Sequence, residues 1–284
     1  MARYRFALRP KWIVSHLFVA ALVVAMIAAA FWQFGRLQQK KDRNARIVAR
    51  TAEPLVPVDT LSSDDKAFGT SSDIEFRRAT ATGRYLADQE VLVRSRSRDG
   101  TPGSWVLTPL DLGNGQAVVV NRGWIPNSGE LNAVPSSDRA PGGEVRVSGL
   151  VRQTETRGRF GPRDPRTGTL DNLARADVAR LDQQVVERLL PLYLQLQSQS
   201  PKPRTDLPRP VPKPELDEGP HLSYAIQWLI FTTVALVGYP LILRRRAGEV
   251  AQEQLEAALD RADPDDVASP GDPRLGPGSA RAER

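Results

Sequence analysis

Two uncharged apolar stretches, residues 12–35 and 222–243, lie near opposite ends of the chain. An α-helix rises about 1.5 Å per residue and the hydrocarbon core of a bilayer is roughly 30 Å thick, so about 20 apolar residues are enough to cross it. Both stretches therefore predict transmembrane helices. The more polar residues between them predict a globular domain that is attached to the membrane at both of its ends.

Residues 36–200 contain short apolar runs separated by turn residues, which is the pattern of β-strands. The runs are rich in Val, Thr, Tyr and Trp and cover residues 75–85, 90–98, 104–112, 116–124 and 144–153. Residues 112–115, Leu-Gly-Asn-Gly, predict a tight turn because Gly and Asn tolerate a positive φ. Apolar and polar side chains alternate over residues 192–197, which predicts a further half-buried strand. These strands predict an antiparallel sheet or a small barrel.

One helix is predicted inside this domain. Asp177 is a candidate N-cap. Apolar residues then recur at helical intervals, namely Val178, Leu181, Val185 and Leu189. Pro191 limits the helix, which is expected to run to about Leu189. The predicted fold class is therefore a membrane protein in which two transmembrane helices flank a β-rich α+β domain.

Two further segments are predicted to lie outside any core. Residues 201–221 are rich in Pro, which lacks a backbone N–H, and they predict an extended strap that returns to the membrane. Residues 244–284 begin with three arginines and continue with a charged sequence that is poor in large apolar side chains. A short helix over residues 250–259 and disorder over residues 265–284 are expected in this tail.

Charges beside the apolar stretches predict the orientation in the membrane. Residues 244–246 are all Arg, whereas residues 215–218 contain three acidic side chains, so the C-terminus is expected in the cytoplasm. Two spans place both ends on one side, so residues 1–11 are also predicted to be cytoplasmic. The domain is then extracytoplasmic, and a bacterial plasma membrane is the expected location.

The first apolar stretch has an alternative interpretation as a cleaved secretory signal. Residues 28–30 are Ala-Ala-Ala, and small residues of this kind precede a signal-peptidase site. The aromatic residues Phe31, Trp32 and Phe34 follow directly, and aromatic side chains are typical of the membrane interface. The sequence favours a retained membrane anchor and leaves cleavage open.

The residue types present limit the chemistry. The chain contains no cysteine, so it forms neither a disulfide nor a thiolate metal site. Its two histidines are His16 and His221, so a Ser-His-Asp triad in the domain would need the one at the membrane edge. Phosphate-binding glycine loops and nucleotide fingerprints are missing from the sequence. The chain is therefore predicted not to be an enzyme.

The formal net charge of +6 is spread along the chain and concentrates beside the predicted spans. Basic clusters at these positions suit contact with anionic lipid. The sequence therefore predicts the lipid bilayer, and no nucleic acid, as a partner.

Several motifs occur in a defined order along the chain. Residues 32–40 read Trp-Gln-Phe-Gly-Arg-Leu-Gln-Gln-Lys and match the pattern W-Q-x-x-R-x-x-x-K. Four further groups follow, at residues 76–78 with 83–85, 103–110, 120–126 and 221–228. The ordered set, together with the two terminal spans, resembles the surfeit locus protein 1 family over residues 8–246.

The resemblance implies an assembly factor for aa3-type cytochrome c oxidase, which assists the insertion of haem a into the catalytic subunit. It implies oxidase subunits and the haem a biosynthesis machinery as partners, and haem a as a transiently bound cofactor. A membrane-anchored scaffold that binds oxidase subunits without contacting haem remains an alternative. An unrelated envelope receptor with a β-rich sensor domain would share the topology but not the ordered motifs.

The resemblance also implies candidate site residues. His221 occupies the position that the family associates with haem binding, and a neutral imidazole is a standard axial ligand of haem iron. Tyr224 and Trp228 follow on the same helical face, where they would wall a porphyrin or form an aromatic belt. Arg122 and Arg36 are candidates for the haem propionates, because a guanidinium suits a carboxylate. Their alternatives are a strand-end side chain and a side chain that reaches lipid phosphate.

Two further predictions concern the other histidine, His16, and the loop that precedes His221. His16 lies near the inner edge of the first span and is interpreted as part of the helix edge, with no ligand role. Gly219 and Pro220 stand where the family often has asparagines, so the loop before His221 departs from the common pattern.

Overall fold

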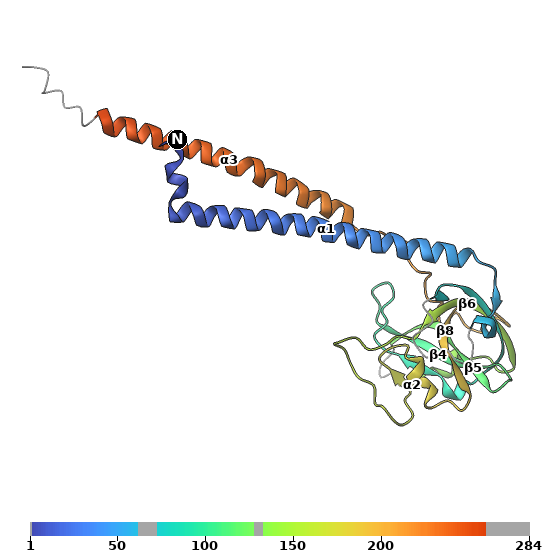
Figure 1. Cartoon of the computed structure of the whole chain (residues 1–284). Helices are drawn as coiled ribbons and strands as arrows, with labels where there is room; N and C mark the ends of the chain where they lie inside the picture. Colours follow the sequence, from blue (N-terminus) through green and yellow to red (C-terminus); the bar gives the residue numbers. More distant parts are fainter. Residues whose placement is uncertain (1, 62–72, 128–132, 260–284) are drawn as a thin grey trace, which may run out of the picture. The chain divides into compact units, whose positions relative to one another are not determined.

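The computed structural model describes residues 2–61, 73–127 and 133–259. The chain divides into two compact units, one formed by residues 1–38 with 219–284 and the other by residues 39–218. The 3₁₀-helix η1 (Ala2–Leu8), most of α1 (Pro10–Ala52) and α3 (His221–Leu259) belong to the first unit (Figure 1). The second unit contains the strands and the short helix α2 (Val178–Asp182).

Helices α1 and α3 are both long and apolar enough to cross a membrane. Their most apolar windows have mean hydropathies of 2.5 and 1.8, and only 11% and 6% of those windows is buried inside the protein. The predicted fold class, two membrane helices that flank a β-rich domain, is confirmed.

Both helices extend beyond the apolar stretches. Residues 36–52 continue α1, because they lack Gly and Pro and are rich in Arg, Lys, Gln and Ala, which favour helix. The helix expected over residues 250–259 is the end of α3. Residues 265–284, predicted to be disordered, lie outside the described residues.

The two helices run side by side and antiparallel (Figure 1). Met26, Ala30 and Gln33 of α1 are buried and recur at intervals of four and three, so they share one helical face. Ala225 and Thr232 are the corresponding buried positions in the apolar part of α3. Small residues at such an interface let two helix backbones approach closely inside a membrane.

The described strands form one eight-stranded sheet in the order β1-β2-β6-β8-β5-β4-β3-β7. The strands are β1 (Val56–Pro57), β2 (Arg78–Tyr85), β3 (Val91–Val93), β4 (Gly103–Asp111), β5 (Gln116–Pro126), β6 (Glu144–Gln153), β7 (Asn172–Leu173) and β8 (Arg188–Ser200). Strand β2 also pairs with β4, which closes β2, β6, β8, β5 and β4 into a small barrel. Of the two predicted arrangements, the barrel is the one formed. Its pairings are antiparallel except for β5 with β8, which is parallel.

Both faces of the barrel wall are buried near β5. Val118 and Val120 point into a core cluster that draws residues from all five barrel strands, so this cluster fills the interior. Ala117 and Val119 point the other way, into a second cluster that includes residues of α2. Because successive side chains of a strand alternate between faces, a strand buried on both sides reads as a continuous apolar run.

Helix α2 is shorter than predicted. The Asp177 cap is confirmed, since its Oδ1 accepts a hydrogen bond of 3.0 Å from the backbone N–H of Arg180. The helix ends at Asp182, whose carboxylate accepts from the backbone N–H of Leu189 at 2.8 Å. Leu189 already pairs with β5, so strand pairing overrides the helical periodicity there.

The Pro-rich strap passes over the barrel and contacts β5 and β8. The backbones of Trp124 and Arg209 exchange two hydrogen bonds, of 2.7 and 2.8 Å. The side chain of Gln195 donates to the carbonyls of Val211 and Pro212. Gly123 adopts a φ of +141°, and a Cβ at this position would lie 2.3 Å from the carbonyl oxygen of Arg209. A glycine is therefore required for the strap to come this close.

Candidate functional site

The first residue of α3 is the candidate haem ligand, His221. Gly219 has a φ of +71°, a conformation that glycine adopts without strain. The carbonyl of Pro220 then accepts the hydrogen bond of the first helical turn, from the backbone N–H of Tyr224 at 3.1 Å. The Gly-Pro pair that departs from the common family pattern is thus a competent helix start.

The ring of His221 is oriented by a residue of the other membrane helix. Its Nδ1 lies 2.8 Å from Oε1 of Gln33, a side chain that is only 9% exposed. An amide oxygen only accepts hydrogen bonds, so Nδ1 carries the proton and a neutral ring keeps the lone pair on Nε2. Within the described residues, no hydrogen bond reaches Nε2. Metal-binding histidines commonly donate their second N–H to an oxygen in this way, so the ring has the tautomer that a metal ligand needs.

Aromatic residues and one arginine accompany His221 in the same unit. Tyr224, one turn along α3, is 48% exposed, and Trp228 contacts the ring of Phe231 edge to face with centroids 6.0 Å apart. The guanidinium of Arg36 lies 5.5 Å from the centre of the Trp32 ring. The structure therefore gathers the candidates His221, Tyr224 and Trp228 on one helix and Arg36 on its neighbour.

His16 has a different arrangement near the start of α1. Its Nε2 lies 3.1 Å from the carbonyl oxygen of Ala7, and its Nδ1 lies 2.7 Å from the hydroxyl of Tyr239. That hydroxyl also contacts Oγ of Ser15 at 2.9 Å. Both ring nitrogens of His16 are engaged, and the cluster joins α1 to the later part of α3. This agrees with a structural role at the helix edge.

Arg122 lies in the barrel domain and is almost fully buried. Its Nη1 donates to Oε2 of Glu90 at 3.1 Å and its Nη2 donates to the carbonyl of Asp138 at 2.8 Å. The hydroxyl of Thr108 donates to the same Glu90 oxygen. Burial raises the pKa of the Glu90 carboxyl, which the Arg122 charge partly offsets, and burial lowers the pKa of Arg122. These contacts favour the structural alternative for Arg122, and a propionate contact stays a prediction.

No group of three or more His, Cys, Asp or Glu side chains that could hold a metal ion occurs in the part of the chain that the structure describes. A haem iron requires less from a protein, because the porphyrin supplies four ligands and one imidazole is a sufficient axial ligand. The free Nε2 of His221 therefore fits haem better than it fits a bare metal ion.

Sequence reasoning missed Gln33 as a site residue. The residue belongs to the motif at 32–40, but its partner lies 188 positions away in the chain. The available signal was a polar amide inside an apolar span, which is costly in a membrane unless it finds a partner.

Comparison with known proteins identifies the family. The SURF1 family matches residues 20–233 of the chain. An uncharacterized SURF1-like protein of Mycobacterium tuberculosis is 32% identical over 242 residues, which cover 84% of this chain and 85% of the relative. A SURF1-like protein of Dictyostelium discoideum is 35% identical over 106 residues, or 36% and 38% of the two chains. The cytochrome oxidase assembly protein SHY1 of Saccharomyces cerevisiae is 27% identical over 162 residues, covering 52% of this chain and 39% of the yeast protein. The chain therefore belongs to the SURF1 family.

Proposed function

We propose that this protein is an assembly factor for cytochrome c oxidase that assists the insertion of haem a into the catalytic subunit of an aa3-type enzyme. Family membership and the similarity to the cytochrome oxidase assembly protein SHY1 of yeast support the oxidase assembly role. The observation that carries the haem role is the hydrogen bond between His221 Nδ1 and Gln33 Oε1, which leaves Nε2 available for an iron.

Each residue of the site has a distinct part in this proposal. His221 holds the haem through Nε2, and Gln33 keeps its ring in the required tautomer and orientation. Tyr224 and Trp228 pack beside the porphyrin, and Arg36 is the candidate for a propionate. The haem, when bound, is cargo: it is carried and passed on, and no covalent bond of the protein changes. The protein is accordingly proposed to be a haem chaperone and not an enzyme.

The charges beside the two helices support the proposed location. Residues 244–246 would keep the C-terminus in the cytoplasm of a bacterial cell, and the barrel domain would then face outward from the plasma membrane. A site beside two membrane helices suits a hydrophobic porphyrin that moves laterally within the bilayer. Oxidase subunits and the haem a biosynthesis machinery, both proposed as partners, would meet the protein there.

An absorption spectrum tests the haem role. The full-length protein is purified from cells that make haem a, and a haem band is expected. His221→Ala should lose the band, whereas His16→Ala should keep it, because both nitrogens of His16 already have protein partners. Both variants must accumulate in the membrane to the wild-type level.

Oxidase assembly is measured in the same strains. Deletion of the gene should lower aa3-type oxidase activity and the haem a content of that complex, and other respiratory enzymes should stay near normal. If His221→Ala keeps full haem content and full oxidase assembly, the haem role is wrong and the scaffold alternative is the better hypothesis. An unchanged oxidase in the deletion strain would contradict both.

A further inference from the structure

A pocket rich in arginine lies on the barrel domain beside α2. Its volume is about 600 Å³ and its wall contains Arg157, Arg163, Asp164, Arg166, Arg175, Asp177 and Arg180, among other residues. Five guanidinium groups face two carboxylates, which leaves an excess of three positive charges. The proposed haem role uses none of these side chains. Much of the wall comes from residues 157–168, named here the arginine loop.

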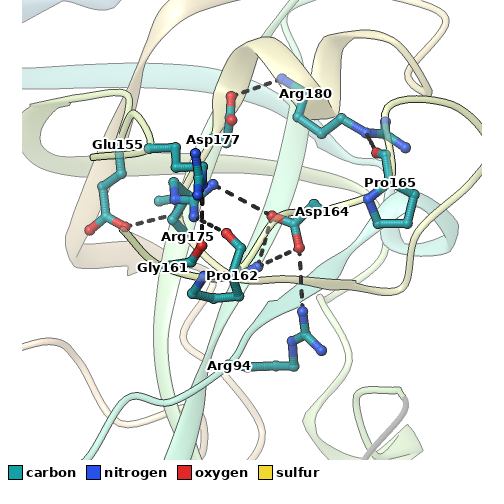
Figure 2. A network of polar contacts seen from close by, with 12 residues as sticks. Arg94, Glu155, Gly161, Pro162, Asp164, Pro165, Arg175, Asp177 and Arg180 are labelled. Carbon is teal, nitrogen blue, oxygen red and sulfur yellow. Dashed lines mark hydrogen bonds and ion pairs between the residues drawn. The ribbon is translucent and has the colours of Figure 1, made fainter. Parts of the chain in front are cut away.

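Backbone carbonyls of the arginine loop are held by arginine side chains (Figure 2). Arg180 donates from Nε to the carbonyl of Pro165 at 2.8 Å and from Nη2 to that of Gly168 at 2.6 Å. Arg175 donates to the carbonyl of Pro162 at 2.6 Å. A carbonyl satisfies a guanidinium N–H without cancelling its charge. The loop is therefore fixed in place, and the pocket stays positive.

Both carboxylates of the pocket already have structural partners. Asp164, whose side chain is 5% exposed, contacts Arg94 at 3.3 Å and Arg175 at 3.9 Å, and it accepts from the backbone N–H of Ala174 at 3.0 Å (Figure 2). Asp177 caps α2. Asp164 is shared with Arg94 as well as Arg175, and Asp177 keeps its charge as a helix cap, so the two carboxylates leave the excess positive charge of the pocket in place.

Arg163 and Arg166 supply the donors that are not yet used. Both are exposed, and within the described part of the chain neither makes a hydrogen bond or an ion pair. A guanidinium presents paired N–H groups that match the oxygens of a phosphate, and several arginines around one pocket are typical of phosphate recognition. The surplus charge and the unused donors therefore point to the same ligand chemistry.

An exposed aromatic side chain lies in the same loop. Phe160 is 84% exposed, and the guanidinium of Arg159 lies 5.8 Å from its ring centre. An apolar ring beside arginines is an arrangement suited to a membrane interface, where the ring enters the lipid and the arginines meet headgroups. The domain is also joined at both ends to a membrane helix, which keeps phospholipid close to it.

We propose that this pocket binds a phosphate-bearing anion, with the headgroup of an anionic phospholipid as the favoured source and free phosphate as the other. Arg163 and Arg166 contact the phosphate oxygens. Arg175 and Arg180 hold the arginine loop in the shape that receives it. Occupancy would further restrain the arginine loop through contacts that involve neither His221 nor haem.

Hydrogen exchange on the full-length protein tests the proposal. The protein is placed in nanodiscs of phosphatidylcholine alone or of phosphatidylcholine with phosphatidylglycerol. The phosphatidylglycerol discs should slow amide exchange of residues 157–168 by about tenfold, as expected when a ligand near ten times its Kd must leave before the loop opens. A second arm adds inorganic phosphate to the protein in detergent, against chloride of equal ionic strength. Protection in the first arm alone identifies the lipid headgroup, and protection in the second identifies free phosphate.

Matched variants separate the pocket from general charge. Arg163→Gln with Arg166→Gln should abolish the protection, because these exposed side chains donate to the ligand and not to the loop. Arg84→Gln with Arg204→Gln removes two exposed arginines elsewhere and should keep the protection. The proposal is overturned if neither phosphate source protects the loop or if both double variants behave alike. No readout involves haem, so the result is independent of the proposed chaperone role.

Discussion

The imidazole Nδ1 of His221 lies 2.8 Å from the side-chain oxygen of Gln33, so the first residue of α3 is tied to a residue well inside α1. A second hydrogen bond joins the same two helices near the other end of the apolar spans, between His16 of α1 and Tyr239 of α3. The two histidines differ in one respect: His16 uses both ring nitrogens within the protein, whereas His221 uses one. Within the described residues, only His221 therefore keeps a ring nitrogen that has no hydrogen-bond partner in the protein.

Replacement of Gln33 should weaken haem binding without removing the ligand. Gln33→Leu preserves the size of the side chain but removes the acceptor of Nδ1–H, so the ring is free to rotate and to change tautomer. Loss of such a supporting hydrogen bond typically costs about 10- to 100-fold in metal affinity. The measurement is a haem titration of the purified full-length protein, followed by absorption.

Two variants control for the packing of the helices. Gln33→Glu keeps an oxygen acceptor and should retain most of the affinity. Tyr239→Phe removes the hydroxyl that contacts Ser15 and His16 and leaves His221 untouched, so its haem titration should match that of the wild type. Equal losses in Tyr239→Phe and Gln33→Leu would mean that helix pairing, and not ring orientation, controls haem binding.

Local patterns in the sequence predict much of this architecture. The two spans follow from composition, the Asp177 cap from a residue type beside an apolar period, and the strands from short runs between turn residues. These signals lie within a few residues of the feature that they predict. The sequence predicts the ends of strands less accurately. It predicts a strand over residues 90–98, whereas only Val91–Val93 form one.

The remaining features depend on contacts between distant parts of the chain. Closure of the barrel requires β2 to pair with β4, and the parallel pairing of β5 with β8 places the start of β8 beside Ala117 instead of on a longer α2. The partners of Arg122 and His221 also come from distant residues, Glu90 and Gln33. No local propensity encodes which partner a buried polar side chain will find.

Gly123→Ala should destabilise the barrel domain. The new Cβ would meet the carbonyl oxygen of Arg209 at 2.3 Å, and the φ of +141° is one that alanine rarely adopts. We expect a loss of about 1–3 kcal/mol in the free energy of unfolding, because either the strap or the strand must shift. Urea unfolding of the full-length protein in detergent measures this free energy.

Gly113→Ala is the matched control, since its φ of +80° is also positive but nothing lies within 4 Å of its Cβ. A loss in Gly113→Ala as large as that in Gly123→Ala would show that backbone strain alone accounts for the effect.

Fusions to alkaline phosphatase test the orientation, because this enzyme is active only outside the cytoplasm. A fusion after Gly161, within the barrel domain, should be active, and a fusion after Arg246 should be inactive, as the arginines at residues 244–246 predict. The reverse pattern would contradict the proposed topology. A mature N-terminus at Phe31 would instead show that the first span is cleaved.

Glu90 should give the stability of the domain a defined pH dependence. Burial raises the pKa of this carboxyl above its ordinary value of 4.5, with the Arg122 charge acting in the opposite direction. As the pH rises through 4.5, the unfolded chain releases the Glu90 proton while the folded domain still holds it. The unfolded state then binds fewer protons, so the contribution of Glu90 to the free energy of unfolding falls with pH. That contribution is complete below pH 4.5 and is lost as the pH passes through the raised pKa.

The difference between the wild type and Glu90→Gln isolates this contribution, because glutamine does not titrate and the other carboxylates cancel. The wild-type unfolding free energy minus that of Glu90→Gln should be largest below pH 4.5 and should decrease above it. Arg122→Met provides a second check. It leaves Glu90 buried without its cationic partner, which should cost about 3–5 kcal/mol at pH 7. That loss should shrink as the pH falls, because protonation of Glu90 removes the unpaired charge. A difference between the wild type and Glu90→Gln that grows with rising pH would mean that pairing with Arg122 outweighs the burial of Glu90.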